Sequence, residues 1–150
     1  IDLAPRGGNL LDIGCGWGPI ALSLALASPK STVWAVDVNQ RSLDLTAMNA
    51  KRLGLTNIKT AKPEDVPGDL EFTGIWSNPP IRVGKAVLHE ILQTWLPRLT
   101  IGGESLLVVQ KNLGADSLQR WLENGLGEAF DISRIDSSKG FRVLSVKKKL

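Results

Sequence analysis

Short apolar segments alternate with helix-like segments along most of this chain, and no other feature restricts its fold as strongly. Five segments are apolar and rich in β-branched residues, as expected of parallel strands that are covered on both faces: residues 9–13, 32–36, 57–61, 74–77 and 105–110. The intervening segments have helical character, which makes the chain a strand–helix–strand series. The alternation predicts an α/β fold with a Rossmann-like, doubly wound, mostly parallel sheet.

Helix signals occupy the connections between the predicted strands. Pro19 suits the first turn of a helix, Asn39 is a good N-cap for a helix over 40–53, and Gly54 follows as a stop. A fourth connection has apolar residues at helical spacing, namely Val87, Leu88, Ile91, Leu92, Trp95, Leu96 and Leu99. After a further helix near 113–124, the alternating segments 129–136 and 141–148 predict a C-terminal antiparallel hairpin.

Length and composition set the limits within which function is sought. The chain has 150 residues, 43% of them hydrophobic, and this size suits one domain with its own core, residues 1–150. A strand follows Ile1 almost at once, so we expect an N-terminal portion to precede it. The longest apolar run, Pro19–Ala27, is shorter than the roughly 20 residues of a membrane span, and we expect a cytoplasmic protein.

The content of cysteine, histidine and charge narrows the classes of site further. One cysteine and one histidine make a metal site implausible and agree with a reducing compartment. The net charge of +3 permits a polyanionic partner such as RNA without demonstrating one.

A glycine-rich turn ends the first predicted strand, with the sequence DIGCGWGP over residues 12–19. Glycines there allow a sharp turn and a close approach of backbone to a ligand. A dinucleotide fingerprint would have its third glycine where this chain has Pro19, which argues against NAD. Asp37 ends the second predicted strand, where a carboxylate accepts hydrogen bonds from ribose hydroxyls. A tight strand-to-helix turn without a ligand is the alternative for the glycines alone.

Asp12 before the glycines and Asp37 after the second strand together resemble the S-adenosylmethionine loop of class I methyltransferases. The resemblance implies that S-adenosylmethionine is the cofactor and that Trp17 lies close to it. Glu64 or Asp65 would face the adenine, although an exposed acidic turn explains them equally well. The implied cofactor-binding residues are Asp12, Gly14, Cys15, Gly16, Trp17, Gly18, Asp37, Val38, Glu64, Asp65 and Asn78.

The sequence Asn78-Pro79-Pro80-Ile81 follows the fourth predicted strand. It resembles the Asn/Asp-Pro-Pro-aromatic signature of methyltransferases that act on exocyclic amino groups. Such an amino group is a poor nucleophile because its lone pair is delocalised. The Asn78 side-chain oxygen and the Pro79 carbonyl would each accept one N–H and turn the lone pair toward the methyl group. The two prolines hold this loop in one shape. A strand that simply stops at proline is the alternative.

Further residues point to RNA as the substrate. Ile81 stands where many amino-methylating enzymes have an aromatic residue, which argues against a stacked, flipped DNA base. The strings GCGWGP, SNPPIRVGK and KGFRVL resemble the small-domain methyltransferases that include the ribosomal RNA guanine-N2 enzymes of the small subunit. Arg82 and Lys85 would then contact RNA phosphates, and ribosomal RNA or the small subunit would be the partner.

Two other functions remain open at this point. The chain would methylate a protein glutamine, whose enzymes resemble it at Asn-Pro-Pro but favour Tyr next, or it would be a cofactor-binding module without activity of its own. Cys15 is expected to serve the turn rather than act as a nucleophile, and His89 to lie on a polar helix face. We expect four tryptophans in the core, namely Trp34, Trp76, Trp95 and Trp121.

Overall fold

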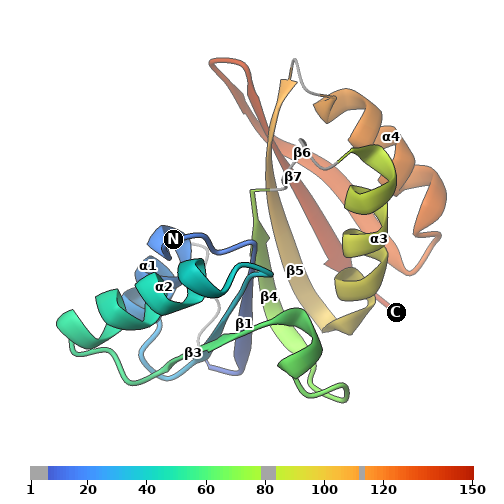
Figure 1. Cartoon of the computed structure of the whole chain (residues 1–150). Helices are drawn as coiled ribbons and strands as arrows, with labels where there is room; N and C mark the ends of the chain where they lie inside the picture. The colour runs from blue at the N-terminus through green and yellow to red at the C-terminus, as the bar shows by residue number, and fades with distance from the viewer. Residues whose placement is uncertain (1–6, 79–83, 112–113) are drawn as a thin grey trace. The chain divides into compact units, whose positions relative to one another are not determined.

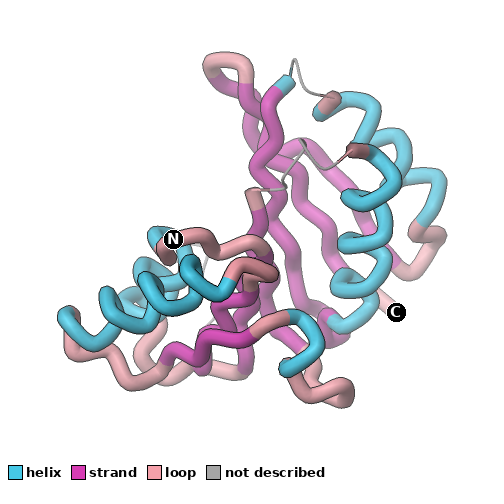
Figure 2. The backbone as a smooth tube through the Cα atoms, in the orientation of Figure 1, coloured by secondary structure: helices cyan, strands magenta, loops and turns pink. Residues whose placement is uncertain are grey.

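The computed structural model describes residues 7–78, 84–111 and 114–150. The chain divides into two compact units, Ile1–Trp76 and Ser77–Leu150. Helices and strands occur in both units (Figures 1 and 2). The predicted α/β composition is therefore confirmed.

The first unit has the predicted order of strands and helices. Its elements are β1 (Asn9–Ile13), α1 (Pro19–Ala27), β2 (Thr32–Val36), α2 (Gln40–Arg52), β3 (Ile58–Ala61), the short helix η1 (Pro63–Asp65) and β4 (Phe72–Ser77), which ends at the unit boundary. The strand order is β3-β2-β1-β4, and β2 pairs with both β1 and β3 in parallel. The register sets Asp12 beside Ala35 and Val36 beside Ala61, so these strands end at one edge.

Helices α1 and α2 cover one face of β1 and β2 in the first unit. Their shared core contains Leu10, Cys15, Ala21, Leu24, Ala25, Val33, Ala35 and Leu43. Asn39 caps α2 as predicted, because its side chain accepts a hydrogen bond from the Ser42 N–H at 3.2 Å. Gly54 follows the end of α2 at a φ of 68°, a conformation that suits glycine.

The second unit consists of α3 (Lys85–Trp95), η3 (Leu96–Arg98), β5 (Leu99–Gln110), α4 (Ala115–Gly125), β6 (Phe130–Ser138) and β7 (Phe141–Lys148). Strand β7 lies between β5 and β6 and pairs antiparallel with both, so the predicted hairpin is confirmed. Figure 1 shows α3 and α4 on the same face of these strands. The core between them contains Leu88, Leu92, Leu96, Leu107, Val109, Ala115, Leu118, Leu122, Leu144 and Val146.

Two details of the fourth connection differ from the prediction. Helix α3 ends at Trp95, because Pro97 cannot continue it and the chain forms a single 3₁₀ turn instead. Strand β5 then begins at Leu99 rather than Ser105, so Leu99 is a buried strand residue. Val87 is 44% exposed and does not belong to the buried stripe.

A two-residue turn joins β6 to β7. Ser138 pairs with Phe141, which leaves Lys139 and Gly140 as the turn, with φ values of 45° and 84°. Positive φ at both central residues is the type I′ pattern, in which Asn, Asp or Gly is favoured at the first position. The Lys111 N–H donates to the Gly140 carbonyl at 2.6 Å and ties this turn to the end of β5.

Candidate cofactor site

The glycine-rich loop between β1 and α1 is anchored on the end of β2. The N–H groups of Gly14 and Cys15 both donate to the Val36 carbonyl, at 2.8 and 3.0 Å. A Cβ on Gly18 would lie 2.9 Å from the Thr46 side chain, whereas a Cβ on Gly16 would meet open space. Gly18 is thus required by packing, and Gly16 leaves main chain accessible to a ligand.

Asp37 links this loop to the start of α2. Its Oδ2 accepts the Gly16 N–H at 3.0 Å, and its Oδ1 accepts the Asn39 N–H at 2.9 Å. A carboxylate has about four acceptor positions, so each oxygen keeps one for a further donor. The carboxylate is half-buried and fixed in place, as a group that receives two hydroxyl donors needs to be.

Two side chains of α2 support the loop, and the sequence analysis did not identify either of them. The Thr46 hydroxyl donates to the Gly16 carbonyl at 3.0 Å, and the Asn49 side chain donates to the Trp17 carbonyl at 3.2 Å. Thr46 is fully buried on the same helix face as Leu43 and Ala50. A threonine at helical spacing between apolar residues was the available signal.

Asp12 is a buried acid beneath the loop. Its side chain is 1% exposed, the Ala21 N–H donates to it, and within the described residues its Oδ2 has no hydrogen-bond partner. Burial raises the pKa of Asp12 to about 7, and the nearby charge of Asp37 adds to this rise. The carboxyl group therefore holds a proton over much of the pH range below neutrality.

Cys15 is also buried in the loop. Burial raises the pKa of its thiol to about 11, so the side chain stays neutral at pH 7. A neutral thiol packed in the core is a poor nucleophile, in agreement with the structural role expected for Cys15.

Two exposed apolar side chains belong to the glycine-rich loop and to the residue that follows Asp37. Trp17 is 58% exposed and Val38 is 78% exposed. Glu64 and Asp65 are exposed in η1, just after β3. The Asp37 N–H donates to the Ala61 carbonyl at 3.3 Å, which brings the end of β3 to Asp37. Charged and apolar groups at one strand edge suit a ligand with a ribose and a flat ring.

The predicted catalytic motif is described only at its first residue. Asn78 directly follows β4 and is exposed, while Pro79, Pro80, Ile81 and Arg82 lie outside the described residues. Lys85 is exposed at the first position of α3. The roles of these residues stay predictions.

His89 is not on a polar face, because its ring stacks on Trp121 of α4 with centroids 3.7 Å apart and planes 6° from parallel. Burial and the charge of Lys85 lower its pKa, so it is neutral at pH 7. Trp95 is buried in the core as predicted, whereas Trp34, Trp76 and Trp121 are only partly buried.

Within residues 7–78, 84–111 and 114–150, no group of three or more His, Cys, Asp or Glu side chains is arranged to hold a metal ion. No helix in the described part of the chain is long and apolar enough to cross a membrane.

Comparison with known proteins identifies the family. Residues 2–145 match the methyltransferase small domain. The chain is 39% identical to the uncharacterized protein YbxB of Bacillus subtilis, over 94% of this chain and 70% of that protein. It is 38% identical to ribosomal RNA small subunit methyltransferase C of Shewanella piezotolerans, over 75% of this chain and 34% of that enzyme. It is 34% identical to release factor glutamine methyltransferase of Rhodopirellula baltica, over 78% of this chain and 42% of that enzyme.

The chain thus spans less than half the length of the two relatives that are named as enzymes. Its fold also resembles those of solved structures. TrmN from Thermus thermophilus superposes with a TM-score of 0.75 at 25% identity, over 95% of this chain and 44% of that one. SMU.1697c from Streptococcus mutans, in complex with SAH, superposes with a TM-score of 0.72 at 16% identity, over 98% and 92%. These likenesses confirm the predicted Rossmann-like fold. The chain belongs to the methyltransferase small domain family of class I enzymes, whose cofactor is S-adenosylmethionine.

Proposed function

We propose that this protein transfers a methyl group from S-adenosylmethionine to an exocyclic amino group, and that its substrate is guanine N2 of ribosomal RNA. The observation that carries the proposal is the Asp37 carboxylate, held by the Gly16 and Asn39 N–H groups at the edge where β1 and β2 end. This is the place at which an open α/β sheet binds its ligand.

The residues of the first unit fit the cofactor. Asp37 has two free acceptor positions for the ribose hydroxyls. Because Gly16 has no side chain and a Cβ there would meet open space, the amino acid portion can approach the loop closely. Trp17 and Val38 supply apolar surface, and Glu64 or Asp65 a polar contact, for the adenine. Asp12 lies beneath the loop as a buried support. When bound, the cofactor supplies an electrophilic methyl group on its sulfonium.

Asn78 and Pro79 are the proposed acceptors for the substrate amino group. Two preorganised acceptors orient the N–H bonds and reduce delocalisation of the lone pair, so no strong base is required. Pro79 and Pro80 restrict the loop through their fixed φ, and Ile81 offers an aliphatic contact surface. Arg82 and Lys85 supply positive charge for RNA phosphates.

A protein glutamine is the second candidate substrate, because one relative is named a release factor glutamine methyltransferase. Ile81 in place of an aromatic residue, together with the adjacent Arg82, favours RNA over glutamine. A cofactor-binding module without activity of its own is the third possibility, and it predicts cofactor binding without transfer to either substrate.

Labelled methyl transfer by the full-length protein tests these substrates together. Ribosomal RNA from cells that lack the enzyme is incubated with labelled S-adenosylmethionine, and the nucleosides are then separated. We expect label in N2-methylguanosine. Label in glutamine of a release factor, with none in RNA, would replace the RNA proposal by the glutamine one. Cofactor binding without any transfer would contradict both.

A further inference from the structure

A hollow of about 640 Å³ lies within the second unit and is separate from the residues assigned above. It is lined by the end of β5, the first turn of α4 and the β6–β7 turn, through Gln110, Lys111, Asp116, Lys139, Gly140 and Phe141. None of these residues has a role in the proposed methyl transfer. The hollow is therefore a candidate for a second binding site.

The main chain around the hollow is well held. The Lys111 N–H donates to the Gly140 carbonyl at 2.6 Å, and Gln110 pairs with Phe141 in the β5–β7 ladder. Phe141 also pairs with Ser138 across the hairpin. These links connect the three strands at one end. The hollow is thus a feature of the folded sheet.

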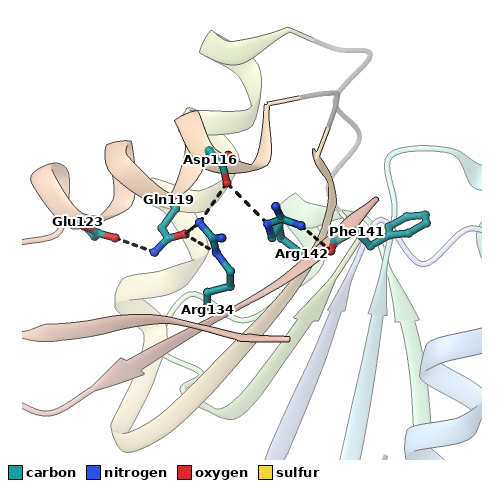
Figure 3. Close-up of polar contacts among 6 residues, drawn as sticks. All are labelled: Asp116, Gln119, Glu123, Arg134, Phe141 and Arg142. Carbon is teal, nitrogen blue, oxygen red and sulfur yellow. Dashed lines mark hydrogen bonds and ion pairs between the residues drawn. The ribbon is translucent and has the colours of Figure 1, made fainter. Parts of the chain in front are cut away.

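Arginines of the hairpin hold the acidic residue of the hollow. Arg134 lies 3.1 Å from the Asp116 carboxylate and also donates to the Gln119 side chain, while the Nε of Arg142 lies 3.8 Å from the same carboxylate (Figure 3). Two guanidinium groups facing one carboxylate leave positive charge in excess. Asp116 therefore does not give the hollow an anionic character.

Two lysines add further positive charge to the lining. In the described parts of the chain, neither Lys111 nor Lys139 forms an ion pair, so both ammonium groups are available to a ligand. Clustered cations of this kind suit phosphate groups. The ligand of the hollow is therefore expected to be anionic.

Phe141 gives the hollow an aromatic component. Its side chain is 40% exposed, and in Figure 3 its ring points away from Asp116 and Arg142. Every nucleobase has a face that stacks on an aromatic ring, so an exposed ring beside cations suits single-stranded nucleic acid.

Lys139 occupies a backbone position that does not favour lysine. Its φ of 45° is left-handed, and Asn, Asp or Gly would adopt it at lower cost. Strained residues are concentrated at functional sites, and a charged side chain at the tip of a hairpin is placed to meet a partner.

We propose that this hollow binds a single-stranded segment of RNA, with Phe141 stacking on a base and with Lys111 and Lys139 contacting phosphates. The proposal rests on the proposed function in taking RNA as the substrate. It assigns part of the RNA recognition to the β6–β7 hairpin tip.

Binding of a fluorescein-labelled single-stranded ribosomal RNA fragment to the full-length protein tests it, with anisotropy measured at several salt concentrations. We expect Phe141→Leu to weaken binding roughly 5- to 150-fold, and Phe141→Tyr to retain it. Lys111→Gln and Lys139→Asn should each reduce the slope of log K against log salt by about 0.7. Lys149→Gln removes an exposed charge outside the hollow and should change affinity less than either.

Wild-type affinity and salt slope in Phe141→Leu and Lys139→Asn would overturn the proposal. If the wild-type protein forms N2-methylguanosine in that case, the proposed function stands and only the role of the hollow as an RNA-binding site is excluded. If RNA binding depends on the hollow but label enters no RNA, the hollow stands and the proposed function fails. Binding of a release factor with no binding of RNA contradicts both.

Discussion

The glycine-rich loop of the first unit and the hairpin tip of the second unit both place residues at positive φ beside charged groups, but they treat the charge differently. In the loop, the Asp37 carboxylate accepts two main-chain N–H groups. Around the hollow beside the tip, the carboxylate of Asp116 is held by two arginines, and neither Lys111 nor Lys139 forms an ion pair with any described residue. The loop is therefore expected to bind through fixed hydrogen bonds, and the tip through screened charges that depend on salt.

Replacing Asp37 by Ala tests the fixed site and should have the largest effect. It removes two charge-assisted hydrogen bonds to the cofactor, each worth roughly 1.5 to 3 kcal/mol, so affinity falls by at least about 100-fold. Calorimetry with S-adenosylhomocysteine measures this loss. Asp44→Ala, which removes an exposed acid of α2, is the control. A folded Asp37→Ala protein with wild-type affinity would mean that the cofactor site lies elsewhere.

Replacing Asn78 by Ala asks whether transfer depends on a residue outside both regions. Loss of one preorganised acceptor raises the barrier by roughly 2.7 to 4 kcal/mol, or about 100- to 1000-fold in rate. Single-turnover methylation with saturating cofactor and RNA isolates that step. Asn124→Ala, which changes an exposed residue of α4, controls for general effects. A wild-type rate in Asn78→Ala would reduce Asn-Pro-Pro to a strand terminator.

The pH dependence of stability tests the role of Asp12, the buried acid beneath the glycine-rich loop. The folded pKa of Asp12 is about 7, above the ordinary value of 3.8. Folding favours the neutral form of Asp12. Its contribution to the free energy of unfolding is therefore complete below about pH 4 and is lost as pH rises through 7. Urea unfolding should show wild type losing about 2 kcal/mol relative to Asp12→Asn between pH 5 and pH 7. Parallel curves for the two proteins would contradict this.

Replacing Lys139 by Asn should have the smallest effect of these substitutions. It separates the backbone strain of Lys139 from the part that its charge plays in RNA binding. Asparagine tolerates positive φ better, so the free energy of unfolding should rise by roughly 0.5 to 1 kcal/mol while RNA binding weakens. Urea unfolding of Lys139→Asn beside Lys149→Gln measures the gain. Lower stability in Lys139→Asn would show that the lysine has a structural role in the turn.

Local signals account for what the sequence predicted correctly. Strands β1 and β2 have the predicted bounds because each is a short, largely apolar segment. Asn39 caps α2 from the adjacent position, and the C-terminal hairpin joins neighbouring segments, so both follow from adjacent residues. The turn itself is shorter than predicted, because β6 continues to Ser138 and only Lys139 and Gly140 remain between the strands. The early start of β5 was missed, because Gly102 and Gly103 interrupt the apolar pattern there.

Contacts between distant segments account for what was missed. The bond from Thr46 to Gly16 joins residues 30 positions apart, and the stacking of His89 on Trp121 joins two helices. The cluster of Asp116 with Arg134 and Arg142 likewise requires the folded hairpin to be placed against α4. Such pairings depend on tertiary structure. The helical spacing of Thr46 between Leu43 and Ala50 indicates a buried position, but it does not indicate the partner.

The dependence of the glycine-rich loop on α2 has a consequence for protein engineering. Gly18 leaves room for Thr46, and Gly16 shares Asp37 with the residue that caps α2. A chimera that takes the glycine-rich loop from a relative and α2 from this protein, or the reverse, would join two segments whose contacts do not match. Crossover points between residues 19 and 36 should therefore yield fewer working hybrids than crossover points placed after Arg52.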